Sequence, residues 1–145
     1  MISINPVRTE KLAASLLTIW KLSVKASHFF LTEKEIDELI PFVKSAIAQI
    51  NVLVVIYAND EPVGFMGIED RKLEMLFISP DYFGKGLGRK LTELAFESFA
   101  VESVDVNEQN PNAVRFYTRI GFVVFDRSEY DSQGNPFPIL KMRLQ

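Results

Sequence analysis

Apolar positions in the first third of the chain recur with the spacing of helices. Over residues 9–25, and again from Thr32 to Ile50, apolar side chains return every three or four positions, which predicts two amphipathic helices. Thr32 and Glu35 form a T-x-x-E capping box at the start of the second helix. Pro41 lies inside that helix, and we expect it to kink or divide the element, because proline lacks the backbone N–H that a helix interior uses.

Short apolar runs in the rest of the chain predict strands. The run VLVVIY (52–57) contains no polar residue, which is typical of a strand buried on both faces. The turn-forming residues NDEP separate it from the next run. A short strand is expected before the first helix, and further strands are expected at 63–68, 73–78, 103–107, 122–130 and 136–144, the last two around the turn DSQGN.

Two more helices are expected between the later strands. The first covers about 85–99 and follows a glycine-rich loop. The second begins after Asn110, a suitable N-cap followed by Pro111, and ends at Gly121. The resulting order is β-α-α-β-β-β-α-β-α-β-β. It predicts an α/β (α+β) fold, a mixed sheet covered by helices, in one domain over residues 1–145.

Composition and charge exclude several classes of protein. The chain is 48% hydrophobic and 24% charged, as in soluble globular proteins. A formal net charge of −3 provides no overall cationic field for nucleic acid or an anionic membrane. The absence of cysteine excludes disulfides and thiolate metal sites, and a single histidine cannot by itself form a zinc site, so no metal is expected. With no signal peptide and no apolar run long enough to span a bilayer, we expect a cytoplasmic protein.

The segment PDYFGKGLGRKL (80–91) holds three of the seven glycines within five residues, directly before a helical pattern. Bare N–H groups at a helix start suit a phosphate. The spacing excludes a P-loop, which needs G-x-x-x-x-G-K-[ST]. A dinucleotide fingerprint has an acidic residue at about the right distance in Asp105, but its third glycine would stand one position after Gly88. A third interpretation is a tight turn whose glycines serve only helix packing.

Two separated motifs carry a family resemblance. The stretches LFISPDYFGKGLGRKL and VDVNEQNPNAVRFYTRIGF resemble the GNAT superfamily of acyl-CoA-dependent N-acetyltransferases, and more narrowly a group of small bacterial acetyltransferases of poorly defined substrate. The second motif contributes Asn110, Ala113, Tyr117 and the pair Gly121-Phe122. The resemblance covers nearly the whole chain. It implies a mostly antiparallel sheet of about seven strands, flanked by about four helices, and acetyl-CoA as co-substrate.

The resemblance also implies which residues bind the cofactor. The strand before the loop is expected to splay from its neighbour, so that the pantetheine arm pairs with strand amides. Phe83 stands where the family has Gln or Arg, which leaves the pyrophosphate to backbone N–H groups and nearby cations. The implied cofactor-binding residues are Leu76, Phe77, Ile78, Gly84, Lys85, Gly86, Leu87, Gly88, Arg89 and Asn110.

Acetyl transfer to an amine needs a proton acceptor, an oxyanion donor and a proton for the leaving thiolate. Tyr117 matches the tyrosine that acts as the acid in the family, and a strand N–H near Ile78 is the expected oxyanion donor. The base is left open between Asp105, Glu74 and a water relay. Each carboxylate could instead be a solvent-facing strand residue or the partner of an arginine.

The resemblance implies that two segments line the acceptor side of the cleft, KASHFFLT and RSEYDSQGNPFP. Their carboxylates and aromatic rings suit a small cationic amine, held by Glu129 with His28 lining the pocket. Phe29 and Phe30 belong to the same loop. The alternatives are a lysine or N-terminal amine of a protein as acceptor, or a degenerate acyl-CoA sensor without transferase activity. A homodimer is possible on the resemblance alone.

Overall fold

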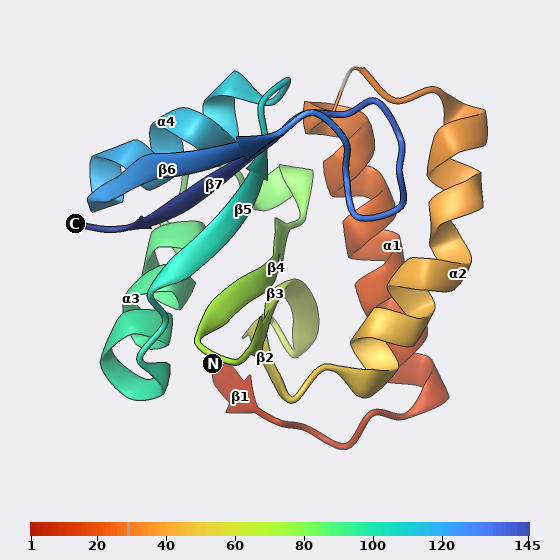
Figure 1. Cartoon of the computed structure of the whole chain (residues 1–145). Helices are drawn as coiled ribbons and strands as arrows, with labels where there is room; N and C mark the ends of the chain where they lie inside the picture. The colour runs from red at the N-terminus through yellow and green to blue at the C-terminus, as the bar shows by residue number, and fades with distance from the viewer. Residues whose placement is uncertain (29) are drawn as a thin grey trace.

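The computed structural model describes residues 1–28 and 30–145, in which helices cover both faces of a central sheet (Figure 1). Phe29 lies outside the described residues. The elements are β1 (Ile2–Ile4), α1 (Glu10–Ser27), α2 (Glu33–Gln49), β2 (Val52–Ala58), β3 (Glu61–Glu69), β4 (Lys72–Ile78), a 3₁₀ turn (Pro80–Tyr82), α3 (Leu87–Phe99), β5 (Ser103–Asn107), α4 (Pro111–Ile120), β6 (Phe122–Ser128) and β7 (Ile139–Leu144). This order and the mixed α/β architecture confirm the predicted fold.

The sheet is mostly antiparallel, with strand order β1-β2-β3-β4-β5-β7-β6. Among the described strands, β4 and β5 form the one parallel pair. They are in register only at Lys72 with Ser103 and at Leu73 with Val104, after which they diverge. The sheet therefore opens in its middle, between the last residues of β4 and of β5.

Alternating side chains of the central strands supply two cores. Leu53 and Val55 of β2 pack with Leu16 and Trp20 of α1 on one face of the sheet. Val54 and Ile56 belong to the cluster on the other face, together with side chains of α3 and α4. Strand residues alternate between faces, so a strand with no polar position can be buried on both sides. That prediction for 52–57 is confirmed.

The capping signals work as predicted. The Thr32 hydroxyl accepts from the Glu35 N–H at 3.1 Å, and the Glu35 carboxylate accepts from the Thr32 N–H at 2.9 Å. Asn110 caps α4 through its side-chain oxygen, and Gly121 ends that helix with φ of +119°. These contacts lie within four residues, so the local sequence specifies them.

The sequence predicts that Pro41 kinks or divides the second helix, and division is wrong, because α2 runs unbroken from Glu33 to Gln49. The buried residues Ile36 and Ile47 lie on either side of the proline and pack in the same core. Tertiary packing of one continuous apolar face outweighs the single backbone bond that proline removes. Among the described helices, none is long and apolar enough to cross a membrane.

Candidate active site

The opening between β4 and β5 leads to a cleft of about 590 Å³. Strand β4, the glycine loop, the start of α3, and helices α1 and α4 all contribute to its walls. Nine of the ten residues expected to bind the cofactor line it: Leu76, Phe77, Ile78, Gly84, Gly86, Leu87, Gly88, Arg89 and Asn110. The exception is Lys85, whose Nζ lies 5.3 Å from the centre of the Tyr82 ring, a cation–π arrangement.

Beyond Leu73, the edge of β4 that faces this cleft has no neighbouring strand among the described residues. On its other edge, β4 pairs with β3 from Lys72 to Ile78, with one register shift between Leu73 and Met75, and Ile78 lies opposite Gly64. On the cleft side, β5 pairs only with Lys72 and Leu73. Backbone groups from Leu76 to Ile78 that point to this side are therefore free to pair with an extended ligand, as in strand addition.

The glycine loop turns the chain into α3, whose first residues line the cleft. Gly84 and Gly86 have φ of +74° and +78°, a left-handed conformation that favours glycine, and Gly86 is the N-cap of α3. A Cβ on either residue would meet nothing within 4 Å, so this surface is open to a ligand. The first N–H groups of a helix carry partial positive charge and suit a phosphate.

Of the lysine and arginine side chains around the loop, Arg89 alone lines the cleft among the described residues. Phe83, at the position of the family's Gln or Arg, is 45% exposed. Arg89 lines the cleft, but it also pairs with Glu93 one turn further along α3 at 3.2 Å, and both side chains are largely exposed. An exposed pair of this kind holds its arginine only weakly, so Arg89 remains available to an anion in the cleft.

Tyr117 of α4 stands between this cleft and a smaller cavity of about 130 Å³ beside β5. The ring is 7% exposed and packs edge-on against Phe116 and Phe122 at centroid distances of 5.1 and 5.7 Å. Within the described residues the hydroxyl has no hydrogen-bond partner, and no side-chain polar atom is both buried and unpartnered. The hydroxyl therefore faces the open space, while burial of the ring raises the pKa of Tyr117 and keeps the group protonated.

The two candidate bases, Glu74 and Asp105, both line the smaller cavity where β4 and β5 diverge. Lys72 lies between them: its Nζ is 2.7 Å from Asp105 Oδ2 and 3.6 Å from Glu74 Oε1. Burial alone would lower the pKa of Lys72, but the hydrogen bond to Asp105 and the charges of both carboxylates outweigh it and raise that pKa. The cation pairs with both acids, so the partner of the carboxylates is a lysine and not the arginine considered from the sequence.

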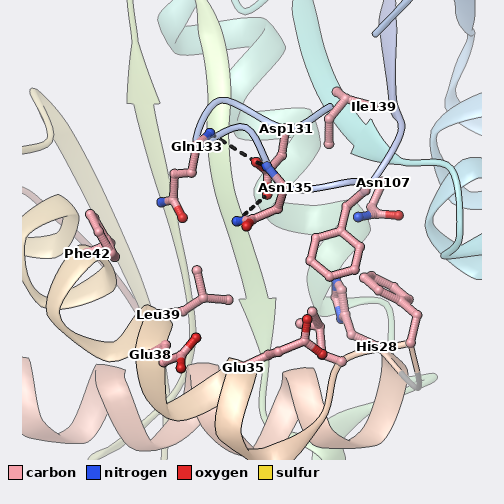
Figure 2. Close-up of a pocket in the computed structure, with 13 residues that line it drawn as sticks. His28, Glu35, Glu38, Leu39, Phe42, Asn107, Asp131, Gln133, Asn135 and Ile139 are labelled. Atoms are coloured by element: carbon pink, nitrogen blue, oxygen red, sulfur yellow. Dashed lines mark hydrogen bonds between the residues drawn. The ribbon is translucent and has the colours of Figure 1, made fainter. Parts of the chain in front are cut away.

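A third cavity, of about 430 Å³, lies between α2 and the loop that joins β6 to β7 (Figure 2). Its lining includes three acidic side chains, Glu35, Glu38 and Asp131, and no lysine or arginine among the described residues. Glu35 is held by its capping bond, and Asp131 accepts from the Gln133 and Asn135 N–H groups at 3.0 and 2.9 Å. Glu38 forms no ion pair or hydrogen bond with the described residues.

The two residues expected to bind the acceptor lie in different places. His28 lines all three cavities. Glu129 is exposed and lines none of them, whereas Asp131, two residues further on, reaches the cavity beside α2. Sequence reasoning assigned Asp131 to the turn and did not consider Glu38, which the 3.6-residue period of α2 places near Glu35 on one helix face. In the described part of the chain, no group of three acidic or histidine side chains is placed to hold a metal ion.

The open edge of β4, the start of α3, which suits a phosphate, and Tyr117 all line one cleft at the opening of the sheet. The acetyltransferase (GNAT) domain family matches residues 23–145, and the chain belongs to this family of N-acetyltransferase enzymes. The sequence is 40% identical over 142 residues to the peptidyl-lysine N-acetyltransferase YjaB of Escherichia coli strain K12, covering 98% of this chain and 96% of that protein.

Solved structures agree with this assignment. The solution structure of apo YjaB from Escherichia coli has a TM-score of 0.86 and 41% identity, with 99% of this chain and 97% of that chain covered. The PaiA N-acetyltransferase of Thermoplasma acidophilum, crystallised with coenzyme A, has a TM-score of 0.68 at 19% identity, with 99% of each chain covered. At that identity the likeness shows the fold, and a protein of this fold holds coenzyme A.

Proposed function

We propose that the protein transfers an acetyl group from acetyl-CoA to the primary amine of a cationic acceptor, with Tyr117 as the proton donor to the leaving sulfur. One observation carries the proposal. The Tyr117 hydroxyl, protonated and without a protein partner among the described residues, stands between the cleft suited to the cofactor and the cavity that holds Glu74 and Asp105.

The cofactor follows the walls of the cleft in this proposal. Its pyrophosphate binds the N–H groups at the start of α3, next to Gly84 and Gly86, with Arg89 as a nearby cation. Its pantetheine arm pairs with the free edge of β4 from Leu76 to Ile78. This placement brings the thioester to Tyr117 at the far end of the cleft, where a strand N–H near Ile78 can donate to the oxyanion.

The chemistry at Tyr117 follows from its environment. A thiol has a pKa of about 8.5, and burial raises the pKa of Tyr117 well above the ordinary value of a phenol. Outright proton transfer from this hydroxyl to the thiolate is therefore uphill. We expect the hydroxyl to donate a hydrogen bond to sulfur as the C–S bond breaks, and to pass its proton while it takes one from the amide nitrogen being formed.

Two classes of acceptor are supported by different observations. The relatives from Escherichia coli and Salmonella typhimurium are named peptidyl-lysine N-acetyltransferases, which favours a lysine side chain of a peptide or protein. The acidic cavity beside α2, with its aromatic and carboxylate lining, favours any extended cationic amine, small molecules included. We propose the lysine side chain as the first acceptor to test and a small diamine as the second.

The test is a transfer assay with acetyl-CoA that follows free thiol and identifies products by mass spectrometry. The acceptors are a lysine peptide with a blocked N-terminus, the same peptide with the lysine pre-acetylated as the control, and a small diamine. We expect thiol release only with a free amine, together with an acetylated product. If acetyl-CoA binds but no acceptor is acetylated, the protein is the sensor module that the sequence left as an alternative. If acetyl-CoA does not bind, both forms of the proposal fail.

A further inference from the structure

His28 occupies the point where the three cavities meet. It ends α1, where its backbone N–H donates to the Val24 carbonyl at 2.8 Å. Its ring lies 5.4 Å from Phe30, which in turn lies 5.6 Å from Phe137 in the loop after β6. Figure 2 shows the imidazole on the same side of the acidic cavity as Asn107, and both residues also line the small cavity beside Tyr117. Among the described residues, His28 is the one that lines the acidic cavity, the small cavity and the cleft suited to the cofactor.

The hydrogen bonds of Ser27 determine which ring nitrogen of His28 carries the proton. Ser27 Oγ lies 2.8 Å from the Ser23 carbonyl and 2.8 Å from His28 Nδ1. A carbonyl oxygen can only accept, so the single hydroxyl hydrogen of Ser27 points to Ser23. The hydroxyl can then only accept from His28. We therefore assign the proton to Nδ1, which leaves a lone pair on Nε2.

That lone pair is accessible. Nε2 has no hydrogen-bond partner within the described residues, and no side-chain nitrogen there is both buried and unpartnered. Burial lowers the pKa of His28 below its ordinary value, so the ring is neutral at neutral pH. The ionisable side chains that share its cavities are Glu35, Glu38, Asp131, Glu74, Asp105, Tyr82, Arg89 and Tyr117.

We propose that His28 Nε2 is the proton acceptor for the attacking amine, an inference that rests on the proposed acetyl transfer. The acceptor ammonium gives one proton to Nε2 as its nitrogen lone pair forms the C–N bond to the thioester carbonyl. As the tetrahedral intermediate collapses, the C–S bond breaks, and Tyr117 passes its proton to sulfur while it takes the second proton of the nitrogen. The proton on His28 passes to solvent. The products are the amide, free CoA thiol and one proton.

The contacts of the carboxylates favour His28 over either of them. Asp105 Oδ2 is 2.7 Å from Lys72, and Glu74 lies 3.6 Å from the same cation. Taking a proton would leave Lys72 beside a neutral acid, which weakens the charge pairing. His28 has no such cation to lose, and Ser27 holds the ring in the tautomer that a base needs.

The first test reads the tautomer directly. His28 is the one histidine of the chain, so nitrogen NMR of the tag-free protein reports it without assignment. We expect the Nδ1–H tautomer at neutral pH and a titration below the ordinary histidine pKa of about 6.5. In Ser27→Ala the Nδ1–H fraction should fall, because the acceptor for that proton is gone. A wild-type ring in the Nε2–H tautomer would overturn the proposal.

The second test is a pH–rate comparison of wild type with His28→Asn, whose side-chain amide can still donate to Ser27. We expect kcat at pH 7 to fall by about 10²–10⁴, the usual contribution of a general base. The variant's rate should then rise about tenfold per pH unit towards the amine pKa of about 10.4. The wild-type rate should instead level off above the acidic limb of its pH–rate profile, which reports the pKa of His28. Glu74→Gln and Asp105→Asn should keep that acidic limb.

Three results separate the possible failures. If His28→Asn keeps the wild-type kcat at pH 7, the role of His28 is refuted while acetyl transfer stands. If the acidic limb survives in His28→Asn and disappears in Glu74→Gln or Asp105→Asn, a carboxylate is the base. If the wild-type protein acetylates none of the amines, the proposed function fails, and the role of His28 fails with it.

Discussion

Gly86→Ala separates the backbone role of the glycine loop from its role in binding. Gly86 has φ of +78° and Gly134, in the loop after β6, has the same φ of +78°. A Cβ on either residue meets nothing within 4 Å. The two substitutions therefore impose the same kind of backbone strain and no clash, but only Gly86 lines the cofactor cleft. Gly134→Ala is the matched control.

The expected magnitudes follow from this geometry. A left-handed conformation costs a non-glycine residue about 1–2 kcal/mol, so each variant should lower Tm by about 2–8 °C in a domain of this size. Acetyl-CoA at 100 times its Kd should stabilise the wild type by about 2.7 kcal/mol. In the proposed placement of the cofactor, the new methyl group of Gly86→Ala stands where the pyrophosphate approaches the backbone. We expect Kd to rise at least tenfold, which lowers the stabilisation at the same ligand concentration to about 1.4 kcal/mol or less.

Thermal unfolding with and without acetyl-CoA measures both effects, and calorimetry gives Kd. Gly134→Ala should lower Tm about as much as Gly86→Ala does. It should keep the full increase in Tm that acetyl-CoA causes in the wild type. If the two variants keep equal acetyl-CoA shifts, the pyrophosphate does not approach the loop at Gly86, and the proposed placement of the cofactor is wrong. A larger shift with NAD than with CoA in the wild type would favour the dinucleotide interpretation of the loop.

Four further variants test the rest of the account. Tyr117→Phe should lower kcat by about 10²–10⁴ with Tm nearly unchanged, because the hydroxyl has no protein partner to lose within the described residues; a wild-type kcat would reduce the tyrosine to a core aromatic. Glu38→Gln should raise the KM of a cationic acceptor about tenfold, or about 1.4 kcal/mol. Glu129→Gln, which changes a residue outside the cavity, should raise that KM much less. The reverse order would favour the sequence-based expectation that Glu129 holds the acceptor. Thr32→Ala should destabilise the protein by about 1 kcal/mol in denaturant titration through loss of its cap, and an unchanged midpoint would contradict that.

The features that could be predicted from the sequence depend on local interactions. The Thr32–Glu35 box and the Asn110 cap act over a few residues, and hydrophobic periodicity located the helices and strands to within a few positions. The third helix begins at Leu87, slightly later than expected, because the left-handed Gly84 and Gly86 delay it. Nothing in the pattern indicated the 3₁₀ turn over Pro80–Tyr82.

The features that escaped prediction depend on contacts between distant residues. Lys72 meets Asp105 across 33 positions only because β4 and β5 pair in parallel for two residues before they diverge. In the loop after β6, the sequence DSQGN predicted the turn. The hydrogen bonds that Asp131 accepts from the backbone of Gln133 and Asn135 decide which carboxylate enters the cavity. Residue types alone did not distinguish it from Glu129, which lies outside.

The central claim is that this site moves an acetyl group from CoA to an amine. Its most direct test is a single-turnover experiment with acetyl-CoA labelled in the acetyl group, enzyme in excess, and a lysine peptide with a blocked N-terminus. We predict that mass spectrometry finds the label in amide linkage on the lysine nitrogen, one label per thiol released, with wild-type protein, and far more slowly with Tyr117→Phe. Bound acetyl-CoA that stays intact in the presence of the peptide and of a small diamine would contradict the claim.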